Sequence, residues 1–287
     1  MKLVSFLAEG GVHHGLLRPD GQRLVDLGPG DLLGLIEAGA AGVEQARAAI
    51  GPERDLASVR LLAPLLRPPK LLALARNYQD HITEAGLPQV DKRRIVPKLF
   101  LKPSSAIIGP DEPVCLPGVS HTSDWEVELA VVIGTRCRDV SLERALDAVF
   151  GYTIANDLSA RTTEWGVERD PDKWNEFFDW LNGKWPDGFA PLGPYLLTAD
   201  EVPDPQALDL SLSVNGERKQ HSNTREMIST VAETIAFAST FMTLEPGDII
   251  ETGTPSGVGA TTGTYLESGD VMEASIELLG TLRTPVQ

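Results

Sequence analysis

Short apolar runs of strand length dominate the chain beyond residue 66. They are AVVIG from Ala130, YTIAN from Tyr152, GPYLLT from Gly193, LSLSVN from Leu210 and the alternating run DVMEASIELLG from Asp270. The earlier part combines the strand-like MKLVSFL with a helical segment around Asp31 to Ile50. Prolines then interrupt LLAPLLRPPK, which predicts a boundary between a small N-terminal domain, 1–66, and a larger domain, 67–287.

Two helices are predicted within the larger domain. Ser141 is a candidate N-cap before LERALDAV, and Asn223 with Glu226 three residues later has the pattern of a capping box. After Asn223, one helical face carries apolar residues at helical spacing, which predicts a core contact. These residues are Met227, Val231, Ile235, Ala238 and Phe241. With few helices and many strands, the predicted fold class is α+β, mainly β.

The composition, with 42% hydrophobic and 23% charged residues, is that of a globular protein. A formal net charge of −16 without a stripe of Lys and Arg disfavours nucleic-acid binding, although it allows a small anionic substrate beside a metal. No apolar stretch approaches the roughly 20 residues of a membrane span. Two cysteines provide neither a disulfide framework nor a zinc motif, so we expect a reduced, cytoplasmic location without membrane contact.

Carboxylates at alternate positions suggest a metal site. Asp124, Glu126 and Glu128 alternate with apolar residues in SDWEVEL, so a strand would place the three acids on one face. A solvated acidic face is the alternative interpretation. Asp157, at the end of the strand-like YTIAN, strengthens the metal hypothesis. An all-carboxylate set favours Mg²⁺ or Mn²⁺, with Ca²⁺ as a further option, whereas the histidines show no zinc-binding spacing.

His81 and Glu84 lie three residues apart in ARNYQDHITEAG and would share one helical face. A carboxylate beside an imidazole orients it as a general base, although an incidental surface contact is also possible. The polar, proline-bounded LPQVDKRRIVP follows, so the pair would lie on a mobile lid.

Three further segments carry candidate ligand-binding groups. ETGTPSGVGATTG lacks the ending of a nucleotide-binding P-loop, and a turn presenting backbone amides and the Thr254 hydroxyl to a carboxylate suits it better. Arg161 and Lys184 could pair with substrate oxygens, although each alone is typical of a surface salt bridge. The aromatic residues of KWNEFFDWLNG either form a pocket wall or simply pack.

Taken together, these segments resemble the fumarylacetoacetate hydrolase family. The shared series is NY-x-x-H-x-x-E, LFLKPSS, E-x-E-L-A-V-V-I-G, N-D-x-S-A-R, G-K-x-x-x-x-F-A-P-L-G-P and TGTP-x-G-V-G, in this order from about Arg76 to Gly259. The resemblance implies a mixed β-roll catalytic domain, a small N-terminal domain and a homodimer.

The resemblance also implies roles for single residues. Glu126, Glu128 and Asp157 match the metal ligands, and His81 and Glu84 match a lid dyad. Lys184 matches a lysine that stabilises an oxyanion. Tyr78, Arg161 and Thr254 match substrate-binding positions. One departure is Glu164, which follows NDLSAR where the family commonly has glutamine, and which would bring a negative charge to the substrate.

The implied activity is metal-dependent hydrolysis of a C–C bond in a 2,4-dioxo acid of the acylpyruvate type. The same enolate chemistry serves an isomerase or decarboxylase acting on hydroxymuconate-like acids or oxaloacetate in the catabolism of aromatic compounds. A protein that binds oxo acids without turnover is a further alternative, with Glu164 as the sign of lost chemistry.

Overall fold

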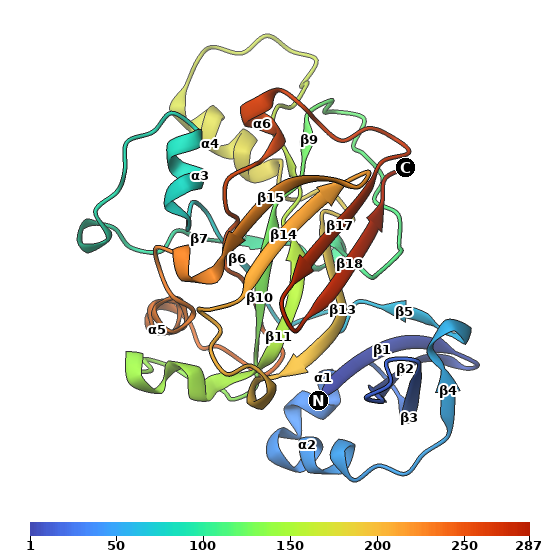
Figure 1. Ribbon diagram of the computed structural model, residues 1–287. Helices are drawn as coiled ribbons and strands as arrows, with labels where there is room; N and C mark the ends of the chain where they lie inside the picture. Colours follow the sequence, from blue (N-terminus) through green and yellow to red (C-terminus); the bar gives the residue numbers. More distant parts are fainter.

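The computed structural model describes residues 1–287, and β-strands dominate it (Figure 1). The strands are β1 (Lys2–Ala8), β2 (Gly11–Leu17), β3 (Arg23–Pro29), β4 (Glu53–Asp55), β5 (Arg60–Leu62), β6 (Leu71–Leu74), β7 (Leu99–Lys102), β8 (Ile107–Ile108), β9 (Ser123–Asp124), β10 (Val127–Ile133), β11 (Val149–Asn156), β12 (Ser159–Ala160), β13 (Ala190–Thr198), β14 (Asp209–Val214), β15 (Glu217–Asn223), β16 (Ile249–Glu251), β17 (Val271–Ile276) and β18 (Gly280–Pro285). The α-helices are α1 (Leu33–Glu37), α2 (Gly39–Arg47), α3 (Gln79–Glu84), α4 (Lys173–Asn182), α5 (Val231–Phe241) and α6 (Gly259–Thr262). Short 3-10 helices are η1 (Leu56–Ser58), η2 (Lys92–Arg94), η3 (Ser104–Ala106), η4 (Leu142–Ala148), η5 (Ala199–Glu201) and η6 (Thr224–Glu226).

One mixed sheet of 12 strands runs through the molecule in the order β4-β3-β2-β1-β13-β11-β10-β16-β6-β7, with β5 beside β1 and β8 beside β13. A four-stranded sheet, β15-β14-β17-β18, crosses in front of β11 and β13 (Figure 1). Leu129 and Ile154 of the long sheet and Leu212 and Leu282 of the four-stranded sheet belong to one buried apolar cluster. The predicted class, α+β and mainly β, is confirmed.

The N-terminal strands and helices gather at one end of the molecule (blue in Figure 1). Their sheet is continuous with the rest, because β1 pairs antiparallel with β13 and Leu3 lies opposite Leu196. The division at residue 66 therefore stays a prediction. The helical segment expected from Asp31 to Ile50 is two helices, since Gly39 adopts a φ of +56° where α2 begins.

Helix α5 begins later than its sequence pattern predicted. Asn223 caps only the short η6, and the capping box of α5 is formed by Thr230 and Glu233. Between them the chain bends, and the Asn77 carbonyl oxygen binds its backbone, accepting from the Ile228 amide at 2.7 Å. Met227 is consequently outside the helix.

The predicted core face of α5 is buried at Val231, Ile235 and Ala238, but Phe241 is 70% exposed at the helix end. Ser141 does precede a helix, although this helix, η4, is of the 3-10 type.

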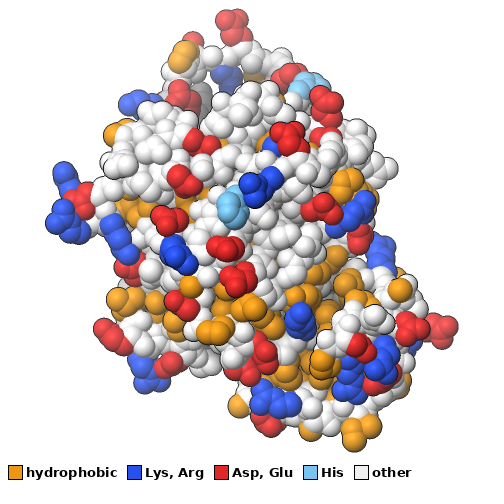
Figure 2. Space-filling model, viewed as in Figure 1, with side chains coloured by type: hydrophobic (Ala, Val, Ile, Leu, Met, Phe, Trp, Pro, Cys, Tyr) orange, Lys and Arg blue, Asp and Glu red, His pale blue; other side chains and the backbone are white.

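Figure 2 shows acidic and basic side chains interspersed over the face in view. None of the helices combines the length and the apolar character that spanning a bilayer requires.

Candidate active site

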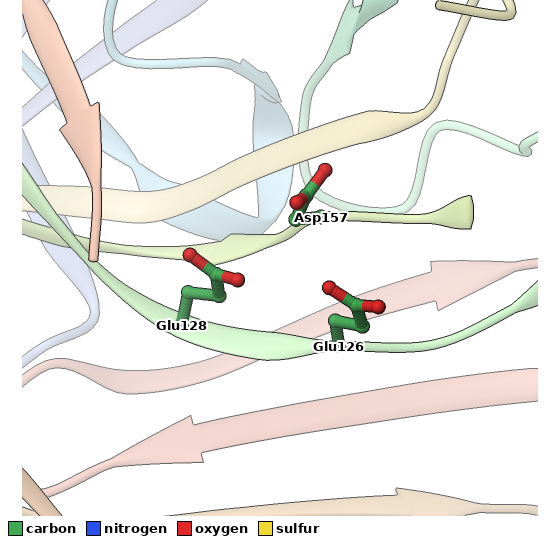
Figure 3. A group of neighbouring side chains, drawn as sticks. All are labelled: Glu126, Glu128 and Asp157. Atoms are coloured by element: carbon green, nitrogen blue, oxygen red, sulfur yellow. The ribbon is translucent and has the colours of Figure 1, made fainter. Parts of the chain in front are cut away.

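Three carboxylates converge where two central strands meet. Strands β10 and β11 are antiparallel with Val127 opposite Asn156, so the residue before β10 lies beside the residue after β11. The Asp157 amide donates to the Glu126 carbonyl oxygen at 2.9 Å and fixes this arrangement. Oxygens of Glu126, Glu128 and Asp157 lie within 4.8 Å of one another, and Figure 3 shows Glu126 and Glu128 along one segment of chain with Asp157 on the chain beside it. All three are buried, which excludes a solvated acidic face.

Asp124 lies apart from this group, contrary to the expectation that it shares a strand face with Glu126 and Glu128. The strand is interrupted, because β9 ends at Asp124 and β10 begins at Val127. The Asp124 carboxylate accepts from the amides of Gly259, at 2.7 Å, and Ala260, at 2.9 Å. Asp124 therefore anchors the loop after β16.

Three cationic side chains hold the acids. Lys184 Nζ lies 2.8 Å from Glu126 Oε2 and 2.7 Å from Asp157 Oδ2. Lys102 is also buried, and it contacts Asp157 Oδ1 and the Phe189 carbonyl oxygen.

The Arg161 guanidinium bridges two carboxylates, with 2.6 Å between Nη2 and Glu126 Oε1 and 2.8 Å between Nε and Asp124 Oδ2. Arg161 and Lys184 are thus largely buried partners of the acidic site instead of surface salt bridges.

These contacts shift the pKa values of Glu126 and Glu128 in opposite directions. Burial alone would raise the pKa of Glu126, but the Lys184 ammonium and the Arg161 guanidinium outweigh it and lower that pKa to about 2. Burial raises the pKa of Glu128 well above its usual range, and the carboxylates of Asp157 and Glu251 raise it further. Burial lowers the pKa of Lys184, yet the charges of Asp157 and Glu126 outweigh this effect and raise it. Glu126 is therefore ionised and Lys184 is charged.

Glu251 and Lys102 are parts of the site that the sequence interpretation missed. Glu251 ends β16, is fully buried, and neither of its carboxylate oxygens has a hydrogen-bond partner. Burial raises its pKa to about 8. The sequence feature that could have revealed them is a charged residue at the end of an apolar run. Glu251 ends the run IIE, and Lys102 ends the run LFLK.

The donor set suits a hard divalent cation. Five carboxylates and three cations are buried or largely buried in and around the site: Asp124, Glu126, Glu128, Asp157 and Glu251, with Lys102, Arg161 and Lys184. With all five acids ionised the formal charge of this group would be −2, which a bound divalent cation would balance. Glu128 Oε1 is buried without a partner, as expected of an oxygen that completes a metal shell.

The predicted dyad is formed on α3. His81 Nδ1 lies 2.8 Å from Glu84 Oε1, so the carboxylate accepts from Nδ1 and leaves Nε2 as the basic nitrogen. Glu84 Oε2 accepts from the Gly257 amide at 2.8 Å, and Ser256 Oγ lies 2.8 Å from Asp80 Oδ2. Helix α3 is thereby fastened to the loop after β16.

That loop, taken together with the start of α6 as 253–261, does present its amides to carboxylates, as its sequence predicted, but the carboxylates belong to the protein. The Gly253 amide donates to Glu128, the Gly257 amide to Glu84 and the Gly259 amide to Asp124. The same loop therefore contacts Glu128, which is a candidate metal ligand, and Glu84 of the dyad. It also contacts Asp124, which binds Arg161. Thr254 Oγ1 donates to the Val127 carbonyl oxygen at 2.9 Å.

A cavity of about 920 Å³ opens over these groups. The predicted site residues that line it are His81, Glu84, Glu126, Asp157, Arg161, Lys184 and Thr254. Two predicted substrate-binding residues are elsewhere. Tyr78 is fully buried and its hydroxyl has no partner, while the Glu164 side chain is 71% exposed and lies 4.0 Å from His121. The charge of Glu164 is therefore solvated outside the cavity.

Known proteins resemble the chain over nearly its whole length. A Burkholderia multivorans protein, whose name assigns it provisionally to the hydrolases, is 44% identical over 98% of this chain and 96% of its own length. The structure of a maleylpyruvate hydrolase from Sphingobium sp. SYK-6, in complex with manganese(II) and pyruvate, is 33% identical with a TM-score of 0.78, covering 100% of this chain and 98% of that chain. A 5-carboxymethyl-2-hydroxymuconate delta-isomerase from Mycobacterium smegmatis is 34% identical with a TM-score of 0.78 and the same coverage.

The sequence model for the C-terminal part of fumarylacetoacetate hydrolase matches residues 70–287. This match covers most of the chain, including every strand that carries an acid of the site. The protein therefore belongs to the fumarylacetoacetate hydrolase family.

Proposed function

We propose that the protein is a divalent-metal-dependent hydrolase that cleaves a C–C bond in a 2,4-dioxo acid of the acylpyruvate type. One observation carries this proposal: the His81–Glu84 pair, two of the three clustered acids and Lys184 open into a single cavity. This shared cavity supports a role for His81 as the base that activates water beside a bound 2-oxo acid.

The metal is proposed to be held by Glu126, Glu128 and Asp157, with Mg²⁺ or Mn²⁺ favoured by the all-oxygen donor set and Ca²⁺ as an alternative. When bound, such an ion supplies a Lewis acid for the 2-oxo acid group. The manganese and pyruvate in the similar maleylpyruvate hydrolase support this assignment.

The protein side chains then account for the proton transfers. His81 Nε2 accepts a proton from water while Glu84 holds Nδ1, and the resulting hydroxide attacks the distal carbonyl carbon. The ammonium of Lys184, a residue that lines the cavity, stabilises the oxyanion formed there. The C–C bond then breaks, releasing a carboxylic acid and the enolate of pyruvate, which takes up a proton at C3.

Arg161 and Thr254 are proposed to bind substrate oxygens at the cavity wall. Arg161 is already bound to Asp124 and Glu126, so its position is fixed before substrate arrives.

Isomerisation is the second candidate, because an isomerase resembles the chain as closely as the hydrolase does. The two reactions differ in the use of water. The assay uses acetylpyruvate as substrate of the purified protein with Mg²⁺ or Mn²⁺ in H₂¹⁸O. Hydrolysis should release pyruvate and acetate, and the acetate should contain one ¹⁸O atom from the water.

Conversion of a hydroxymuconate-like acid without cleavage would favour an isomerase, and release of CO₂ from oxaloacetate a decarboxylase. Binding of oxalate without turnover of any of these substrates would indicate a binding protein.

Glu164→Gln is the matched control for these assays. The exposed Glu164 side chain lies outside the cavity, so the variant should keep full activity.

A further inference from the structure

The cavity is larger than the chemistry at its base requires. At about 920 Å³ it lies in the range of pockets that hold drug-sized ligands, whereas a pyruvyl group is only a few atoms long. The charged groups that the proposed reaction uses occupy one part of it. The remaining wall includes three aromatic residues, Phe100, Phe177 and Trp180.

These rings form a connected series that begins beside the reacting groups. Lys184 Nζ lies 5.8 Å from the centroid of the Phe100 ring. Phe100 meets Trp180 edge to face at 5.0 Å, and Trp180 lies 5.9 Å from Phe177. A substituent that leaves a carbonyl carbon near Lys184 would therefore meet Phe100 first and Trp180 next.

Helix α4 exposes an aromatic face, formed by Trp174, Phe177 and Trp180, at least partly to solvent. None of its residues is buried, and Trp174 is 69% and Phe177 47% exposed. A short helix that exposes several large apolar side chains to water loses the burial free energy that their rings could provide. An apolar group in the cavity would recover part of it.

We propose that the substrate carries an aromatic ring on its distal carbonyl, as an aroylpyruvate does, and that this ring binds against Phe100, Phe177 and Trp180; the inference rests on the hydrolase function proposed above. Edge-to-face contacts with the aromatic series would orient the ring while the dioxo acid group reaches Lys184.

A second carboxylate on the substrate is the competing choice, since Arg76, Lys98 and Lys173 also line the cavity. All three basic residues are exposed, and the acidic Glu176 lies among them. Water screens a charge pair at such positions, whereas Phe100, whose ring centroid lies 5.8 Å from Lys184 Nζ, and the adjoining Trp180 offer apolar contacts that water does not replace. The aromatic substituent is therefore favoured.

The test compares benzoylpyruvate, acetylpyruvate and fumarylpyruvate as substrates of the full chain with Mn²⁺. We expect kcat/KM for benzoylpyruvate to exceed that for acetylpyruvate by about tenfold or more, mainly through KM. Trp180→Ala and Phe177→Ala should remove most of this preference and leave acetylpyruvate turnover within about threefold. Phe241→Ala, which removes an exposed ring that does not line the cavity, is the control and should change neither value.

Equal turnover of benzoylpyruvate and acetylpyruvate would overturn the inference and leave the hydrolase function standing. Preference for fumarylpyruvate that is lost in Lys173→Ala would overturn it in favour of a dioic acid. A change of oligomeric state in Phe177→Ala by light scattering, with unchanged substrate preference, would overturn it by assigning the face to a second copy of the chain.

A binding measurement separates this inference from the proposed function. If no acylpyruvate is cleaved, the hydrolase function fails, and calorimetry with phenylpyruvate and pyruvate still tests the aromatic subsite. Tighter binding of phenylpyruvate that weakens in Trp180→Ala would support the subsite, and equal binding of both acids would overturn it.

Discussion

Glu126 and Glu128 are two residues apart, yet their surroundings differ in charge. Glu126 lies between Lys184 and Arg161, whereas Glu128 has no cationic partner and accepts only the Gly253 amide. Removing the charge of one acid should therefore have the opposite effect on stability from removing the charge of the other, although both changes remove a proposed metal ligand.

The first prediction uses this contrast. Glu128→Gln should raise the melting temperature of the metal-free protein, because it relieves repulsion among buried carboxylates. Glu126→Gln should lower it, since a buried cation loses its partner at a cost of about 3–5 kcal/mol. Both variants should weaken Mn²⁺ binding in calorimetry by at least about tenfold. Undiminished Mn²⁺ affinity in either variant would contradict the metal assignment.

Glu251 provides a pH-dependent prediction. Its pKa of about 8 in the folded protein exceeds the value of about 4.3 for an unfolded glutamate, so the folded state holds the proton across this window. The stability present below about pH 4.3 is therefore lost as the pH rises toward 8, by about 1.4 kcal/mol for each unit of difference. Because glutamine does not titrate, Glu251→Gln should increase the metal-free melting temperature more at pH 8.5 than at pH 5.

The matched control for this experiment is Glu273→Gln, which replaces an exposed carboxylate on β17. Its melting temperature should follow that of the parent protein at every pH. If Glu251→Gln also gains nothing between pH 5 and pH 8.5, burial does not hold a proton on Glu251.

At the scale of elements, the loop 253–261 joins parts that are distant in sequence. Its amides bind Glu128 on β10 and Glu84 on α3, and Ser256 adds a contact to Asp80. Helix α3 has only six residues, and a helix of this length is marginal without tertiary contacts. The position of His81 therefore depends on the loop.

Ser256→Ala should consequently loosen α3 without altering the acids. Loss of one hydrogen bond of about 1 kcal/mol predicts faster amide exchange in residues 79–84 and a kcat/KM about fivefold lower, with unchanged Mn²⁺ affinity. Thr83→Ala is the control because the Thr83 hydroxyl bonds only to its own helix. Unchanged exchange in Ser256→Ala would show that the contact does not hold the helix.

The elements also show what the sequence could predict. Local patterns located β10, β11, β13 and the dyad, because alternation, apolar runs and i to i+3 spacing are properties of neighbouring residues. The predicted start of α5 was wrong, because Asn77 binds the backbone of residues 228 and 229 and no local sequence pattern indicates that contact.

Glu251 and Lys102 were missed for the same reason. A single charge in an apolar run becomes part of a site only when β16, β6 and β7 are placed beside β10. The family resemblance identified the motifs from their order along the chain. The positions of Glu251 and Lys102 beside the site became known only from the fold.

At the scale of the whole molecule, the long sheet crosses the predicted domain boundary. Strand β1 pairs with β13 along its edge, and Leu3 belongs to the same apolar cluster as Leu71 and Leu196 of residues 67–287. The terminal amino group also donates to Thr198 Oγ1 at 2.6 Å. The N-terminal segment thus contributes to the same core that holds the site, whereas the predicted homodimer stays a prediction.

Removal of residues 1–66 should therefore destabilise the rest of the chain even though the family match begins at residue 70. It would uncover the edge of β13 and the apolar partners of Leu3, and an uncovered edge strand promotes aggregation. We expect residues 67–287 alone to aggregate or to melt well below the full chain in calorimetry and light scattering.

Two single substitutions in the full chain locate the cause of that loss. Leu3→Ala removes a fully buried side chain and should cost about 2–5 kcal/mol in free energy of unfolding. Leu7→Ala, in the same strand but 46% exposed, should cost much less. If 67–287 melts like the full chain and Leu3→Ala is neutral, the N-terminal segment is an independent domain and the β1–β13 pairing does not stabilise the site.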